Sequence, residues 1–357
     1  MSENQDISNR EPVENLVVLL RGFFATPVLS SLGRLGVLQK MREMEYFDAE
    51  SFPVVKNRKL LQDSLNYLLR LGLISKDTDN LQHYKVSKKG SEVFRRVNSF
   101  YVPHSYADYL TKYHEMIQVE DGSVTPEVER LENVIGSGIT HLRYFPPAVS
   151  FLKRKTKFNI LIDIGCGDGH FLSTVLKEVV GKKIVAIDMS EISTERTKAN
   201  LLEEYPDLDL TTYCCDGANV QEWSKLVPND TDTSQIAISM WFLLQEISKS
   251  NPNAVIEFLN KVRKNFPKSP IIIGEMVRQS DEILQKNNHR SLIPEYLFFH
   301  EMSKQGVLPW DDYLNIIKKV GYEIVVEKLF DEVPDIQGRL IPSTFVWCLI
   351  PKENHDE

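Results

Sequence analysis

The 357-residue sequence lacks both a long apolar run and a surplus of positive charge. No stretch approaches the roughly 18 apolar residues that a membrane-spanning helix needs, and the first residues, MSENQDISNREPVE, are polar, unlike a signal peptide. The formal net charge of −8 argues against a surface that coats nucleic acid, because phosphate contacts require clustered lysine and arginine. These absences predict a cytoplasmic protein with a small-molecule ligand and with neither a membrane nor a nucleic-acid partner.

Cysteine is scarce as well. The four cysteines (Cys166, Cys214, Cys215 and Cys348) form no CxxC pair, so we do not expect a zinc site of the cysteine type. With 42% apolar and 26% charged residues the composition is that of a globular protein, and the chain is long enough for two domains.

Residues 1–100 predict a mainly helical domain that ends in a small β-ribbon. Apolar residues recur at helical spacing in ENLVVLLRGFFATPVLSSLGRLGVLQKM and again in RKLLQDSLNYLLRLGLI, and LQHYKVSKKGSEVF alternates like the wing of a winged helix. A DNA reader would concentrate basic residues on its second helix, whereas leucine-rich faces dominate here. We therefore expect a winged-helix dimerisation domain, followed at 101–150 by a connecting helical segment that contributes to the substrate pocket.

From residue 151 to 357 the pattern changes to strands that alternate with helices. Near-continuous apolar strands of this kind predict a parallel sheet covered on both faces, the α/β class. The last two strands lack a clear helix between them, which favours an antiparallel edge strand. The predicted strands are 158–164, 183–188, 210–214, 235–240, 270–275, 322–329 and 344–350.

Three successive predicted strands end in an acid, and the first is followed by the glycine loop of LIDIGCGDGHF. Glycine lets the backbone approach a ligand at the carboxyl ends of the strands. The spacing GxGxG differs from the GxGxxG of dinucleotide binders. Asp188 suits the two hydroxyls of a ribose and Asp216 an exocyclic amine, although an aspartate at such a position commonly caps a helix.

In the order DIGCGDG, VAIDMS and CCDGA, the sequence resembles the class I S-adenosylmethionine-dependent methyltransferases. The resemblance implies a Rossmann-like sheet of seven strands, mostly parallel with an antiparallel C-terminal hairpin, and S-adenosylmethionine as the cofactor. It places the methionine part against the glycine loop, the ribose on Asp188, and the adenine near Met189, Asp216 and Gly217. The cofactor-binding residues expected from it are Asp163, Gly165, Gly167, Gly169, Asp188, Met189, Asp216, Gly217 and Met240.

The helical domain ahead of such a sheet is similar to that of small-molecule O-methyltransferases, whose N-terminal domains intertwine in a homodimer. That family carries a His-Asp pair after the fourth strand, in which the histidine removes the acceptor's proton. This chain has Gln245 and Glu246 there, and glutamine cannot take a proton at neutral pH. Glu275 matches the family's acid that orients the base.

MWFLLQE followed by LFFHEMSKQG also resembles the C-methyltransferases that act on 2-oxo acids. In part of that family two histidines hold a metal that stabilises the enolate. The resemblance offers His300 as a catalytic residue and His300 with Gln245 as ligands of a divalent or ferric metal, with His141 as a possible third ligand. Arg143 would clamp the carboxylate, and Trp241 would contact the acceptor.

Three functions follow. The first is C-methylation at the β-carbon of a 2-oxo acid, and the second is O-methylation of a phenolic or hydroxylated metabolite. The third is a non-enzymatic regulator that senses the nucleoside and binds DNA through the winged helix. The acidic balance of the chain disfavours the third.

Overall fold

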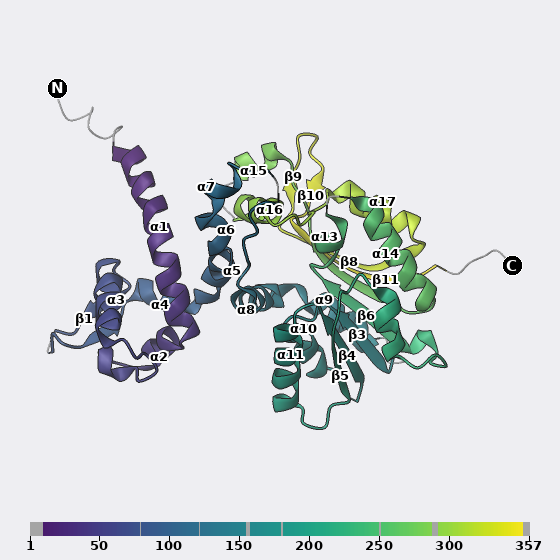
Figure 1. Ribbon diagram of the computed structural model, residues 1–357, viewed down its shortest axis with the longest axis horizontal. Helices are drawn as coiled ribbons and strands as arrows, with labels where there is room; N and C mark the ends of the chain where they lie inside the picture. Colours follow the sequence, from purple (N-terminus) through teal and green to yellow (C-terminus); the bar gives the residue numbers. More distant parts are fainter. Residues whose placement is uncertain are drawn as a thin grey trace. The chain divides into compact units, whose positions relative to one another are not determined.

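The computed structural model describes residues 10–78, 80–120, 122–154, 158–179, 181–249, 251–287 and 292–352 (Figure 1). The chain divides into two compact units, Met1–Ser137 and Gly138–Glu357. The division falls inside helix α8 (Arg130–His141).

The first unit begins as a small helical domain around one apolar core. Asn57 caps α3 by accepting a hydrogen bond from the backbone N–H of Leu60 at 3.0 Å, and Ser87 caps α4 through the N–H of Gly90 at 2.9 Å. The expected β-ribbon is present, because β1 pairs with β2 in antiparallel register. The elements are α1 (Arg10–Arg34), α2 (Val37–Glu43), α3 (Arg58–Arg70), β1 (Ile74–Lys76), β2 (Tyr84–Val86) and α4 (Lys88–Arg95).

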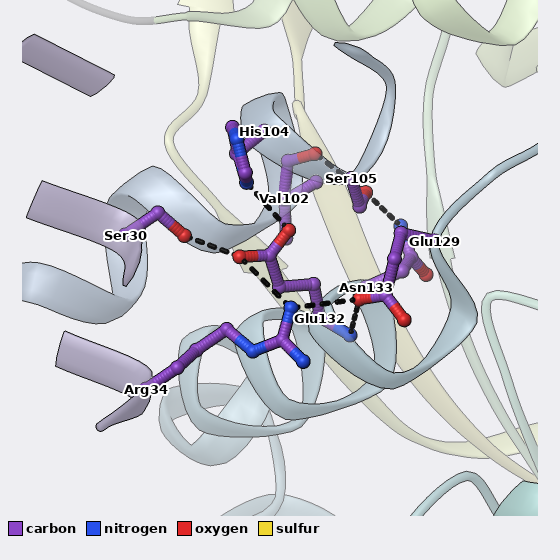
Figure 2. Close-up of polar contacts among 8 residues, drawn as sticks. All are labelled: Ser30, Arg34, Val102, His104, Ser105, Glu129, Glu132 and Asn133. Atoms are coloured by element: carbon purple, nitrogen blue, oxygen red, sulfur yellow. Dashed lines mark hydrogen bonds and ion pairs between the residues drawn. The ribbon is translucent and has the colours of Figure 1, made fainter. Parts of the chain in front are cut away.

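Short helices follow, namely α5 (Tyr101–Ser105), α6 (Ala107–Thr111) and α7 (Tyr113–Met116), before α8. The carboxylate of Glu132 in α8 is buried and lies at the centre of a polar cluster (Figure 2). It accepts a hydrogen bond from the hydroxyl of Ser30 and lies 2.7 Å from Nδ1 of His104 and 3.5 Å from Nη1 of Arg34. Partners from α1 and α5 therefore satisfy this buried charge and join three helices of the first unit.

Helix α1 corrects one sequence expectation. Its segment Leu16–Arg34 covers 19 residues and is apolar and long enough, by composition, to cross a membrane, whereas no such run was expected. The isolated polar residues within it, such as Arg21 and Thr26, do not lower its average hydropathy enough to disqualify it. Only 22% of the segment is buried, so most of this apolar surface is exposed in the single chain.

The second unit is built on a seven-stranded sheet in the order β5-β4-β3-β6-β7-β11-β8. The five strands from β5 to β7 are parallel. Their order reverses between β4, β3 and β6, which puts a topological switch point beside β3, where open α/β sheets bind ligands. The strands are β3 (Ile160–Ile164), β4 (Lys183–Asp188), β5 (Leu210–Cys214), β6 (Ile236–Trp241), β7 (Ile271–Met276), β8 (Tyr322–Phe330) and β11 (Thr344–Pro351).

Helices cover both faces of the sheet, as the apolar strands require (Figure 1). One core cluster joins the sheet to α12, α14 and α17, and a second joins it to α9, α10 and α11. The helices of this unit are α9 (Pro146–Arg154), α10 (His170–Leu176), α11 (Glu191–Glu204), α12 (Val220–Trp223), α13 (Leu244–Ser248), α14 (Pro252–Asn265), α15 (Asp281–Asn287), α16 (Ile293–Met302) and α17 (Trp310–Lys319).

The C-terminal hairpin confirms the predicted fold and refines one detail. The last strand, β11, lies between β7 and β8 and is antiparallel to both, so the edge of the sheet is β8. Burial explains this order, because β11 is apolar on both faces while β8 alternates between half-buried and exposed residues. A small antiparallel ribbon of β9 (Val333–Pro334) and β10 (Leu340–Ile341) lies in the connection between β8 and β11.

Candidate functional site

The glycine loop after β3 folds back on the end of β4. The N–H groups of Gly165 and Cys166 both donate to the carbonyl of Ile187, at 2.8 and 2.9 Å. Gly165, Gly167 and Gly169 have φ angles of 76°, 58° and 83°, in the left-handed region that favours glycine. A Cβ added at Gly165 would have Cδ1 of Leu243 as its nearest neighbour, at 3.7 Å, so the backbone borders open space that a ligand can enter.

Asp188 lies at the end of β4 and braces this loop. Its Oδ2 accepts the N–H of Gly167 at 3.0 Å, and its Oδ1 accepts the N–H of Ser190 at 2.9 Å. A carboxylate offers about four acceptor positions, so a carboxylate at this place is of the kind that can accept the hydroxyls of a ribose. The placement fits the role that the resemblance implies.

Asp163 occupies a different environment. It is fully buried at the end of β3 and accepts a hydrogen bond from the hydroxyl of Ser239 at 2.6 Å. Burial, together with the nearby charge of Asp188 and against the hydrogen bond from Ser239, raises the pKa of Asp163 to about 7. This acid is therefore poised between its protonated and ionised forms near neutral pH.

The remaining cofactor candidates divide into two groups. Met189 is exposed beside Asp188, and Asp216 caps its own turn by accepting the N–H of Ala218 at 2.9 Å. Met240, by contrast, is buried in the core cluster between the sheet and α14, so we assign its side chain to packing and not to cofactor contact. The alternation of side chains along a strand explains this, because Met240 and Trp241 must face opposite sides of the sheet.

Leu243 is a residue that the sequence pattern does not single out. Its Cδ1 and Cδ2 atoms lie 3.7 Å from the positions that a Cβ would take at Gly165 and Gly217 respectively. The side chain of Leu243 thus lies between the loops after β3 and β5 and provides an apolar surface next to both glycines. No sequence signal distinguishes it from the neighbouring leucine of FLLQ, Leu244.

At the end of β6 the backbone turns sharply. Phe242 has a φ of 54°, which is uncommon for a bulky residue, and its N–H donates to the carbonyl of Gly274 at 2.8 Å. The ring of Trp241 packs edge-on against Phe145, with centroids 4.7 Å apart. Its Nε1–H is buried and makes no hydrogen bond within the described residues. A buried indole donor without a partner is costly, which favours a ligand at this end of the strand.

Gln245 and Glu275 lie together at the ends of β6 and β7. The carboxylate of Glu275 is buried and accepts the backbone N–H of Leu244 at 2.5 Å and that of Met276 at 3.3 Å, which anchors the start of α13. Burial raises the pKa of Glu275 to about 8, although these N–H donors oppose the shift. The side-chain Oε1 of Gln245 is buried and has no hydrogen-bond donor within the described part of the chain.

Glu246 and His300 are linked through the segment that follows α16. The amide of Gln305 donates to Oε1 of Glu246 at 3.2 Å, and its backbone N–H donates to the carbonyl of His300 at 2.8 Å. The next N–H, that of Gly306, donates to the carbonyl of Gln245 at 2.8 Å. Residues 300–306 are therefore tied to α13 and border the same end of the sheet.

The buried imidazole of His300 is held by its own helix. Its Nδ1 lies within hydrogen-bond distance of the carbonyl of Tyr296. Burial lowers the pKa of His300, against the effect of that hydrogen bond. The ring is then neutral at neutral pH, and a proton on Nδ1 leaves Nε2 as an acceptor.

His141 and Arg143 have partners that differ from the expected ones. The ring of His141 stacks on Phe242 with centroids 3.8 Å apart, and burial, helped by His170 and Arg143, lowers its pKa to about 3. The guanidinium of Arg143 lies 2.5 Å from a carboxylate oxygen of Asp331 and 2.5 Å from the hydroxyl of Tyr144. A role as a carboxylate clamp would require Arg143 to leave this ion pair.

The residues do not fit the metal that one resemblance allowed. Across the described ranges, no three or more histidine, cysteine, aspartate or glutamate side chains are grouped closely enough to hold an ion. His300 and Gln245 would supply two donors, one of them a neutral amide, and the ring of His141 is engaged by Phe242. We derive no step through a metal.

Comparison with known proteins agrees with this geometry. Residues 147–292 match the family described as "Histidine-specific methyltransferase, SAM-dependent". No curated protein matches the chain in sequence. The chain therefore carries an S-adenosylmethionine-dependent methyltransferase domain and is an enzyme of that class, with S-adenosylmethionine as its cofactor.

Solved structures share the fold over nearly the whole chain. Human N-acetylserotonin methyltransferase in complex with SAM is 12% identical, covers 99% of this chain and 100% of its own, and has a TM-score of 0.62. An O-methyltransferase family protein from Burkholderia thailandensis is 11% identical, with coverages of 96% and 99% and a TM-score of 0.63. N,N-8-amino-8-demethyl-D-riboflavin dimethyltransferase (RosA) from Streptomyces davawensis is 13% identical, with coverages of 95% and 99% and a TM-score of 0.53.

Proposed function

We propose that this methyltransferase acts on an oxygen of a small hydroxylated acceptor without the help of a metal. The observation that carries the proposal is the pairing of two acceptor atoms at one end of the sheet. Oε1 of Gln245 is buried without a donor in the described chain, and the neutral ring of His300 keeps Nε2 available. The hydroxyl of an acceptor would donate its one hydrogen to Nε2 of His300, and a second polar hydrogen of the acceptor would be accepted by Oε1 of Gln245. Several of the solved structures with this fold are O-methyltransferases.

Two side chains would prepare the acceptor. Nε2 of His300 accepts the hydrogen bond of the hydroxyl and takes its proton as the new C–O bond forms, and Oε1 of Gln245 aligns the acceptor by accepting a second polar hydrogen from it. S-adenosylmethionine supplies a methyl group on a positively charged sulfur, which departs with the electrons of the broken C–S bond. Glu275 anchors the backbone that presents Gln245, and Trp241 and Phe242 exclude water from the methyl path.

C-methylation at the β-carbon of a 2-oxo acid, the first function expected from the sequence, becomes the second hypothesis. One observation favours it, because a neutral histidine can also remove a proton from carbon beside a carbonyl. The described residues offer too few ligands for the metal that would stabilise the enolate. The regulator hypothesis loses support, since the catalytic domain is that of an enzyme.

Product analysis separates these hypotheses. The protein is incubated with methyl-labelled S-adenosylmethionine and phenols, hydroxylated acids, 2-oxo acids or histidine, with and without a chelator, and products are assigned by mass spectrometry and NMR. Histidine is included because the matched family is described as histidine-specific. We expect the methyl label on oxygen, in the same amount with and without the chelator. A label on the β-carbon, or on a ring nitrogen of histidine, would overturn the proposal, and His300→Asn serves as the control for background transfer.

We also propose that the first unit forms a homodimer through α1. Residues 16–24 of this helix are exposed on all sides, with Leu19 73% and Phe23 66% exposed. A helix that is apolar all round is normally buried, and a second copy of the same helix is the occupant that matches it in apolar character. The exposed apolar residues of this segment are Leu16, Val17, Val18, Leu19, Leu20, Phe23 and Phe24.

The oligomeric state tests the dimer. Light scattering on the native chain should give twice the mass of one copy, and Leu19→Glu with Phe23→Glu should give a monomer. Leu81→Glu is the matched control, because Leu81 is 70% exposed in the same unit but lies in the ribbon region. A monomeric native chain would contradict the dimer, and binding to lipid vesicles that the double variant abolishes would assign the helix to a membrane surface instead. A cytoplasmic location stays a proposal.

A further inference from the structure

A pair of an imidazole and a carboxylate lies directly at the glycine loop, within the second unit. Asp168 belongs to the loop, and His170 is the first residue of α10. Nδ1 of His170 lies within hydrogen-bond distance of Oδ1 of Asp168. The two side chains differ in exposure, because that of Asp168 is 3% exposed and that of His170 is 30% exposed. The pair therefore combines a buried acid with a ring that a ligand can reach.

This pair can place a positive charge beside the loop. A buried carboxylate is costly unless an opposite charge pairs with it, and among the described residues His170 is the only partner of the Asp168 carboxylate. The imidazolium form of His170 supplies that charge. Both of its ring nitrogens are then donors, and Nε2 has no acceptor in the described part of the chain. Residues 161–171 contain no lysine or arginine, so His170 is their only group that can be cationic.

The end of α8 shows where the pair lies relative to the sheet. Gly138 lies against it, since a Cβ added there would be 2.7 Å from Nδ1 of His170 and 2.9 Å from Oδ1 of Asp168. His141 follows three residues later on the same face of α8, and its ring stacks on Phe242 at the end of β6. His170 therefore lies between the loop after β3 and the end of β6, at the switch point of the sheet.

His141 is close to His170 but cannot share its role. Burial is the main cause that lowers the pKa of His141 to about 3, and the charges of His170 and Arg143 lower it further. The ring of His141 is therefore neutral at neutral pH. An anionic group that enters this end of the loop meets one charged donor, Nε2–H of His170.

We propose that Nε2–H of His170 donates a hydrogen bond to the carboxylate in the methionine part of S-adenosylmethionine, with Asp168 as the positioning residue that orients the ring. The methionine part carries an ammonium and a carboxylate, and only the carboxylate can accept this bond. The pair thereby selects S-adenosylmethionine over its decarboxylated form, which has an ammonium and no acceptor for the donor. The inference concerns the cofactor alone and does not depend on which atom of the methyl acceptor is methylated.

The first test compares two ligands by calorimetry on the full-length protein. They are S-adenosylhomocysteine and its decarboxylated analogue, which keeps the ammonium. S-adenosylhomocysteine should bind at least about tenfold more tightly, because a hydrogen bond between charged groups is lost in the analogue. His170→Asn keeps an N–H group that can bond Asp168, and it should remove this preference by weakening S-adenosylhomocysteine alone. His114→Asn, an exposed histidine of the first unit, is the matched control and should leave both affinities unchanged.

Two further variants test the orientation of the ring. Asp168→Asn keeps an oxygen for Nδ1–H but removes the charge that stabilises the imidazolium, so the same selective loss is expected. Gly138→Ala brings a methyl group against Nδ1 of His170 and should displace the ring, with the same selectivity. Gly22→Ala is its control, because no atom lies within 4 Å of a Cβ at that position. The thermal midpoint checks folding, and His170→Asn decides the test if Asp168→Asn fails to fold.

Three results would overturn the inference. An equal loss of affinity for both ligands in His170→Asn would show a structural role. Unchanged affinities with a loss of turnover would make His170 a base for the methyl acceptor. Weaker binding of the decarboxylated analogue, with unchanged binding of a deaminated analogue that keeps the carboxylate, would assign the ring to the ammonium. Each of these results leaves O-methylation standing, because product analysis tests that proposal separately.

Discussion

The carboxyl edge of the sheet has two halves that differ in how their polar groups are satisfied. Around β3 and β4 the loops are closed by their own hydrogen bonds, with Asp188 bound to two backbone N–H groups and Ile187 to two more. Around β6 and β7 the backbone is strained at Phe242, and Gln245 and Trp241 leave buried polar atoms without partners in the described chain.

This difference indicates that the two halves of the sheet edge bind different ligands. A loop that is already held by its own hydrogen bonds suits a cofactor that is the same in every turnover, because the backbone of the loop need not change. Unsatisfied buried groups cost free energy in the empty protein, and they are retained where a ligand completes them. We therefore propose that the first half binds S-adenosylmethionine and that the second binds the acceptor.

Breaking the cofactor half should weaken cofactor binding strongly. Asp188→Ala removes the acceptor of two backbone N–H groups and of the ribose hydroxyls. Hydrogen bonds to a charged group contribute about 1.5–3 kcal/mol, so S-adenosylhomocysteine affinity should fall by about 100-fold in calorimetry. Asp230→Asn, an exposed surface change, is the control. Unchanged affinity would remove Asp188 from the cofactor site.

His300→Asn breaks the acceptor half alone. A positioned general base contributes about 10²–10⁴-fold, so turnover should fall by at least 100-fold while S-adenosylhomocysteine affinity stays within twofold. Turnover is measured with the acceptor identified by product analysis, and S-adenosylhomocysteine affinity is measured by calorimetry. Retained turnover would assign His300 to packing, and a parallel loss of cofactor affinity would contradict the division between the two halves.

Gly274→Ala should disturb the acceptor half through packing. A Cβ at this position would lie 2.3 Å from Cε3 of Trp241, so the indole must move. Overpacking costs about 1–3 kcal/mol, measured as a lower midpoint of chemical denaturation with turnover reduced more than cofactor binding. The double variant Gly274→Ala with Trp241→Phe should recover stability, because the smaller ring frees the space. No recovery would show that the strain lies in β7 itself.

The smallest effect is a pH dependence of stability. The pKa of Glu275 is about 8 in the folded protein against an ordinary value of 4.5, so its contribution is complete below about pH 4.5 and is lost as the pH rises to about 8. Asp163, raised to about 7, acts in the same direction. The thermal midpoint of the native protein should fall by a few degrees from pH 5 to pH 8, and Glu275→Gln should reduce this fall. An equal fall in that variant would exclude Glu275 as its cause.

The strand and glycine loop of the β3–β4 half could be predicted from sequence, whereas the surroundings of His300 could not. The predicted strand 183–188 coincides with β4, because a buried parallel strand is a continuous apolar run, and glycine marks the loop because only a residue without a side chain readily adopts its φ angles. The surroundings of His300, by contrast, depend on bonds between Gln245, Gln305 and Gly306, and the first of these lies some 60 residues before the other two. Neither periodicity nor motif spacing predicts such contacts.

A crystal structure of the full-length protein with S-adenosylhomocysteine tests the division of the sheet edge most directly. We expect the ribose hydroxyls on Asp188 and the amino-acid part against the glycine loop, with Oε1 of Gln245 and Nε2 of His300 facing space that the cofactor leaves open. A cofactor that itself occupies the space beside His300, or that makes no contact with Asp188, would contradict this account.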